Sequence, residues 1–108
     1  WLKTAGNADA DLPLPDLGKK LYVDKGCNAC HSLDGSNMIG PTWKGLYNKK
    51  REFTNAAPVN ADQNYLRESI IYPNRKIVKG YAGVMPSYAG LLSDREIDGI
   101  IEYIKTLK

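Results

Sequence analysis

The stretch Cys27-Asn28-Ala29-Cys30-His31 decides how this chain of 108 residues folds. It contains both cysteines and the single histidine of the sequence. Two thiols three residues apart can add across the two vinyl groups of a haem, and a histidine directly after them can then bind the iron. We therefore interpret the pentapeptide as the attachment site of one haem c, held covalently through Cys27 and Cys30, with His31 as an iron ligand.

Other chemistries of a Cys-x-x-Cys pair fit this sequence less well. A redox disulfide of this type normally follows a strand and opens a helix in an alternating strand–helix pattern, which is absent here. A structural zinc ion needs four ligands, and the chain has only three cysteines and histidines together. A structural disulfide between residues so close in sequence has unfavourable geometry. Haem attachment is the interpretation that remains.

The composition is that of one small globular domain. Hydrophobic residues make up 43% and charged residues 25% of the chain, which is ordinary for such domains. No apolar run approaches the length of a membrane span, and no signal-peptide pattern is present. A core of this size is modest, so we expect a haem at its centre to supply much of the apolar contact.

The first fifteen residues differ from the rest in composition. Residues 1–15 are polar, with two prolines near their end, which favours a linker or tether over a core element. A frayed terminus of a free-standing protein has the same composition. Because the chain begins with Trp1 rather than methionine, we expect it to be a processed or excised piece. We predict a linker over 1–15 and the haem domain over 16–108.

The net charge of +3 is mild. The basic residues are spread along the chain, with one denser run at Lys49-Lys50-Arg51, and no pattern indicates binding to nucleic acid. These charges form either an ordinary solvated surface or a docking patch for an acidic redox partner.

Apolar periodicity predicts three main helices and an all-α fold. The clearest helix follows Ser93, which starts a capping box with Glu96. An apolar stripe then runs along it, at Ile97, Ile100, Ile101 and Ile104. Two further helices are expected over 16–26, with Asp16 as N-cap, and over 62–72, ended by Pro73. We predict no strand pairing, and long functional loops over 32–42 and 73–92.

A second histidine ligand is impossible within this chain, so the thioethers are the candidates for the second ligand of the iron. The two methionines are Met38 and Met85. Met38 is only seven residues from His31, a contour of at most about 24 Å, and Gly35 and Gly40 suggest turns in this segment that shorten the reach. Met85 has ample chain to cross to the opposite face. We therefore predict His31 and Met85 as the metal ligands.

Other residues are expected to orient the ligands and bind the haem carboxylates. Ligating histidines usually donate their second ring nitrogen to an acceptor, for which the carbonyl of Pro41 is our candidate. The side chains that could donate to the carboxylates are Trp43, Tyr47, Arg51 and Tyr65. Histidine–methionine ligation raises the reduction potential and leaves no open position for substrate. The sequence thus favours electron transfer over catalysis, and we predict no catalytic residue.

Residues 17–108 resemble the class I c-type cytochromes. The first half of the resemblance consists of Gly18, Leu21 and Tyr22 ahead of the cysteine motif, then residues 40–47 (GPTWKGLY). The second half consists of Gly80-Tyr81, residues 84–88 (VMPSY) and residues 101–104 (IEYI). The resemblance implies three helices around one haem, His31 and Met85 as axial ligands, and a helix crossing at Gly18 and Tyr103. Asn48 stands where the family often has glycine.

Residues 61–70 (ADQNYLRESI), together with Pro73, resemble a narrower group. They are similar to the cytochrome domain fused to subunit II of caa-type cytochrome c oxidases. This resemblance implies electron delivery to the binuclear copper centre of a terminal oxidase, by a domain that is no enzyme on its own. It also implies a parent protein bound to a bacterial membrane and a position on the extracytoplasmic, periplasmic side. The alternative is a free or membrane-tethered carrier that shuttles between respiratory complexes.

Overall fold

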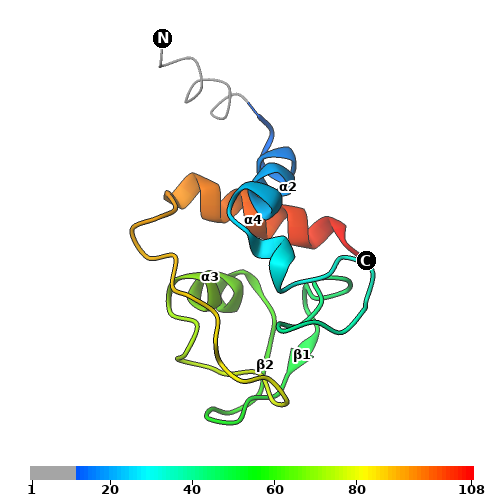
Figure 1. Ribbon diagram of the computed structural model, residues 1–108, viewed down its shortest axis with the longest axis vertical. Coiled ribbons are helices and arrows are strands. Elements are labelled where there is room, and N and C mark those ends of the chain that lie inside the picture. The colour runs from blue at the N-terminus through cyan, green and yellow to red at the C-terminus, as the bar shows by residue number, and fades with distance from the viewer. Residues whose placement is uncertain (1–11) are drawn as a thin grey trace.

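Three α-helices and long irregular segments build the domain, as a computed structural model of residues 12–108 shows (Figure 1). In chain order the elements are α2 (Leu14–Asp24), the 3-10 helix η1 (Cys27–Ala29), β1 (Lys50–Arg51), β2 (Val59–Asn60), α3 (Gln63–Ile71) and α4 (Asp94–Thr106). Residues 1–11, most of the predicted linker, lie outside the described residues. No helix within 12–108 is long and apolar enough to cross a membrane.

Helices α2 and α4 cross in close contact (Figure 1). A β-carbon added to Gly18 would lie 2.6 Å from the β-carbon of Tyr103 and would overlap the carbonyl oxygen of Gly99. A β-carbon on Gly99 would lie 3.1 Å from the carbonyl oxygen of Leu14. The predicted crossing of Gly18 and Tyr103 is therefore confirmed, and Gly99 is a second glycine that allows it.

The starts of the helices follow their capping residues, with one correction. Ser93 and Glu96 form the predicted capping box of α4, and the side chain of Asp62 accepts a hydrogen bond from the amide of Tyr65 at the start of α3. Asp16, which we predicted as the N-cap of α2, lies inside the first turn, because the helix begins at Leu14. Pro15 suits the first turn, since its ring fixes a helical φ and the missing N–H has no partner there.

The prediction of no strand pairing is wrong. Strands β1 and β2 form a two-stranded antiparallel sheet in which Arg51 pairs with Val59, and a further bridge joins Phe53 to Val78. Each strand has only two residues, so the sequence contains no alternating stretch from which they could be predicted. The sheet matters because it fixes the position of Arg51.

Asn48 takes a backbone conformation that glycine usually supplies. Its φ is +66°, the one left-handed non-glycine residue in the described part of the chain. Asparagine tolerates this region better than most residues do. The amide of Asn48 donates to the carbonyl of Ala61 over 2.8 Å, so the turn leads the chain directly into the pairing of β1 with β2.

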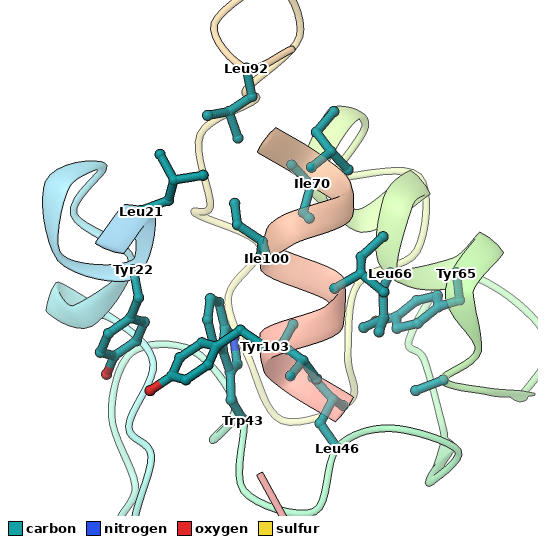
Figure 2. Close-up of a cluster of buried hydrophobic side chains, with 14 of the residues drawn as sticks. Leu21, Tyr22, Trp43, Leu46, Tyr65, Leu66, Ile70, Leu92, Ile100 and Tyr103 are labelled. Carbon is teal, nitrogen blue, oxygen red and sulfur yellow. The ribbon is translucent and has the colours of Figure 1, made fainter. Parts of the chain in front are cut away.

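Buried side chains from all three α-helices gather around α4 (Figure 2). Leu21 and Tyr22 come from α2, Leu66 and Ile70 from α3, and Trp43 from the loop after the cysteine motif. These residues are all less than a tenth exposed. The helices thus form a frame on one side, and the loops close the molecule on the other.

The close crossing predicts that substitutions at Gly18 and Gly99 destabilise the protein to different extents. Gly18→Ala forces a β-carbon against the backbone of α4, so we expect the free energy of unfolding to fall by about 2 kcal/mol or more. Gly99→Ala should cost less, because its nearest contacts are looser and the Leu17 side chain can shift. Urea unfolding of the holoprotein measures both, with Lys19→Ala on the exposed face of α2 as control. A Gly18→Ala protein as stable as the parent would contradict the close crossing.

Candidate haem site

A large cavity opens between α3, α4 and the irregular segments of the chain. Its empty volume is about 1250 Å³ when the open mouth is included. Eight of the nine predicted site residues line it: Cys27, Cys30, His31, Pro41, Trp43, Arg51, Tyr65 and Met85. The remaining lining is mainly apolar, and no aspartate or glutamate of the described residues contributes to it.

The cysteine motif reaches the cavity on a single turn of chain. Gly26 turns the chain just after α2, with a left-handed φ of +75°, and η1 begins at Cys27. The amides of Cys30 and His31 both donate to the carbonyl of Cys27, over 3.2 and 3.0 Å. Both thiols are half-buried and unpaired, and within residues 12–108 no group of three metal-ligating side chains could hold a metal ion. The turn therefore presents two thiols to one cavity.

The imidazole of His31 is oriented for binding a metal. Its Nδ1 lies 2.7 Å from the carbonyl oxygen of Pro41, and because a carbonyl only accepts, Nδ1 carries the proton and donates it. This is the hydrogen bond that we predicted, and it leaves the lone pair on Nε2. Burial is the main cause that lowers the pKa of His31, so the ring is neutral at neutral pH, the form that binds metals.

Neighbouring residues hold the His31 ring in this orientation. A β-carbon on Gly40 would lie 2.6 Å from Cε1 of the ring, so only glycine allows the chain to pass so close. The indole of Trp43 packs against the imidazole, with ring centroids 5.5 Å apart. The hydroxyl of Tyr22, from α2, donates to the carbonyl of His31. The close fit of Gly40 was not predicted, because the sequence shows it only as a turn residue.

The structure separates the two methionines. Met85 lines the same cavity as His31 and is half-buried. Met38 is 40% exposed and is not among the residues that line the cavity. Of the two thioethers, only that of Met85 is therefore placed to act in the site.

Arg51 brings an unpaired positive charge to the cavity. Its Nε is buried without a hydrogen-bond partner, and no ion pair to a described residue involves its side chain. Burial lowers the pKa of Arg51, but an arginine stays protonated at neutral pH. A half-buried cation with a buried, unpaired Nε favours an anionic partner. A carboxylate of a haem supplies one, so the residues present fit that group.

Tyr47 does not line the cavity, in contrast to the other predicted carboxylate donors. The ammonium group of Lys105 lies 5.1 Å from the centre of its ring, which places Tyr47 against the end of α4. The amide of Gly45 donates to the carbonyl of Leu107, and this contact directs the segment toward α4. Trp43 and Tyr65 remain with Arg51 around the cavity.

Two thiols, a neutral imidazole, a thioether and an unpaired guanidinium around one apolar cavity define a c-type haem protein. The comparisons agree: residues 15–108 match the family described as "Cytochrome c". The chain therefore belongs to the cytochrome c family. It has the three-helix class I fold, carries one haem c bound through Cys27 and Cys30, and is an electron carrier rather than an enzyme.

Individual relatives show how the domain is used elsewhere. Cytochrome c2 iso-1 of Magnetospirillum fulvum is 29% identical over 92 residues, which cover 76% of this chain and 91% of that protein. The cbb3-type cytochrome c oxidase subunit CcoP of Helicobacter pylori is 31% identical over 88% of this chain but only 28% of the subunit. Among solved structures, cytochrome cH from Methylobacterium extorquens is 31% identical with a TM-score of 0.63, over 84% of this chain and 96% of that one.

The unpaired charge of Arg51 predicts an effect on the reduction potential. In Arg51→Met the haem carboxylate loses its cationic partner, and its negative charge then favours the ferric state. We expect the potential to fall by tens of millivolts. For a one-electron couple, about 59 mV corresponds to a tenfold change in the equilibrium constant. Lys50→Met, at the exposed neighbouring position, is the matched control and should change the potential little. Equal potentials for the parent and Arg51→Met would contradict this role of Arg51.

Proposed function

We propose that His31 and Met85 bind the iron of the haem from opposite sides. The bound haem supplies one redox-active iron that exchanges a single electron. The contribution of the chain is a neutral imidazole oriented by Pro41 and a thioether that lines the same cavity. Two protein ligands that persist in both oxidation states keep reorganisation small and leave no open position for a substrate.

We further propose that the domain delivers electrons to the copper centre of a terminal haem–copper oxidase, as the cytochrome module of its subunit II. The observation that carries this proposal is the run 61–70, which resembles that group of domains. In the structure the run forms α3 with its cap: Asp62 starts the helix, and Tyr65, Leu66 and Ile70 line the cavity. Arg67 forms ion pairs with Asp94 and Asp98 of α4. The run therefore lines one part of the cavity, and its ion pairs connect α3 to α4.

A relative supports a place for this domain in an oxidase. The subunit CcoP contains a stretch that is 31% identical to this chain and amounts to 28% of its length. With a module of this kind, we place the protein on the extracytoplasmic side of a bacterial membrane, with residues 1–15 as the tether to a preceding domain. The electron donor is then a second redox protein or complex.

A free or membrane-tethered carrier is the second candidate. The observation that favours it is the extent of the alignments, which cover 91% of the cytochrome c2 and 96% of the cytochrome cH. Those proteins consist almost wholly of this domain. A carrier of that kind uses one surface for donor and acceptor in turn.

The proposed ligation predicts different results for the two methionines. Met85→Ala removes the thioether, so we expect cyanide or carbon monoxide to bind the iron readily and the reduction potential to fall. Met38→Ala, at the exposed position, should leave both properties unchanged. Visible spectroscopy during ligand titration measures binding, and redox titration measures the potential. Identical results for Met85→Ala and the parent would show that Met85 is not the ligand.

The mass of the native protein separates the two proposed functions. A haem-stained gel of membranes and soluble extract from the source cells shows which polypeptide carries this sequence. A band in the membranes far above the 12.0 kDa of this chain is expected for an oxidase subunit. A band near that mass in the soluble extract would instead support the free carrier, and the assignment to an oxidase subunit would fail.

A further inference from the structure

Met85 lies in a short stretch whose backbone forms no hydrogen bond with the backbone of residues 12–108. Residues 72–92 contain neither a helix nor a strand. Among the described residues, no backbone hydrogen bond involves positions 82–86. The position of the thioether therefore depends on the points at which the chain is held on either side of it.

Before Met85 the chain is held by apolar packing and by hydrogen bonds between residues 77–79 and residues 52–55. The side chain of Ile77 lies against Gly83, where an added β-carbon would come within 3.0 Å of its Cδ1. The amide of Tyr81 donates to the carbonyl of Val78 over 3.1 Å. These contacts bring the segment to the cavity, and the thioether lies only a short stretch of chain beyond them.

After Met85 the chain is held at Tyr88, three residues on. The amide of Tyr88 donates to the carbonyl of Ile70 over 3.1 Å, at the end of α3. Its hydroxyl donates to the carbonyl of Lys25 over 2.9 Å. Beside it, the hydroxyl of Ser87 donates to the carbonyl of Ile71 over 2.6 Å. Tyr88 thus connects the segment to both α3 and the end of α2.

The carbonyl of Lys25 is a significant partner because it lies directly ahead of the cysteine motif. Lys25 is the C-cap of α2, where carbonyls lack helical partners, and Cys27 is only two residues away. The bond spans 63 positions of sequence. It joins the segment that carries the thioether to the loop that carries the thiols and the imidazole.

We infer that Tyr88 is a positioning residue for Met85: its hydroxyl, bonded to Lys25, holds the thioether at the distance from the cysteine loop that ligation requires. The inference rests on the proposed ligation of the iron by Met85. Burial raises the pKa of the Tyr88 hydroxyl, so it stays protonated at neutral pH and remains a donor. Three residues of chain span at most about 11 Å, so a change in the position of Tyr88 also changes the position of Met85.

Imidazole binding to the ferric holoprotein tests this role, because imidazole must displace the thioether before it binds. In Tyr88→Phe only the hydroxyl is lost, and we expect imidazole affinity to rise about 3- to 10-fold, the effect of one net hydrogen bond. Tyr72→Phe is the matched control: Tyr72 is 52% exposed, and its ring stacks on Arg75. Urea unfolding of both variants separates this effect from a general loss of stability, which would not change imidazole affinity under native conditions.

The same titration in a Met85→Ala background decides how Tyr88 acts. If Tyr88 works through Met85, then Tyr88→Phe adds nothing once the thioether is gone. A rise that persists in this background would overturn the inference, since Tyr88 would then control access to the cavity. Unchanged affinity in Tyr88→Phe, together with a strong rise in Met85→Ala, would also overturn it but leave the ligation intact. If Met85→Ala itself binds imidazole no better than the parent, the proposed ligation fails.

Discussion

The proposed ligation of the iron depends on a single neutral imidazole held in one orientation. The carbonyl of Pro41 accepts the hydrogen bond of Nδ1, and burial keeps the ring of His31 uncharged. Gly40 lets the backbone pass close to the ring, and Trp43 packs against it. Since the lone pair of Nε2 is the only one left, the side from which iron can be bound is determined. The two thiols and this imidazole lie on the same turn of chain, so the proposed ligation uses the loop that attaches the haem.

The part of the cavity that Met85 lines is built in another way. The segment around Met85 has no regular structure, and its position comes from contacts with distant parts of the chain. Helix α3 supplies several of these contacts. Its last carbonyls accept from residues 87 and 88, and Glu68 accepts hydrogen bonds from Arg75 and Lys76. These bonds lower the pKa of Glu68, with Lys76 the larger cause. The position of Met85 therefore depends on bonds between distant parts of the chain, in contrast to that of the helices.

The features that could be predicted from the sequence are local ones. Helix α4 follows from its capping box and isoleucine stripe, and the partner of His31 is a carbonyl only ten residues away. Strands of two residues have no period to detect, so the sheet that places Arg51 was missed. Tyr47 and Tyr65 are equivalent donors by residue type, and only the tertiary fold puts one of them in the cavity. The bond from Tyr88 to Lys25 spans too much sequence for any local pattern to reveal.

The proposed electron transfer requires that one imidazole and one thioether of this chain bind the iron together. The most direct test is NMR of the ferrous holoprotein with isotope-labelled methionine methyl groups, because the chain has only two methionines. Replacing Met38 with leucine assigns the signals. We expect one methyl shifted strongly by the ring current of the haem, which remains in the Met38→Leu protein and belongs to Met85. Two methyl signals at ordinary positions would contradict the ligation, because neither thioether would then lie on the haem.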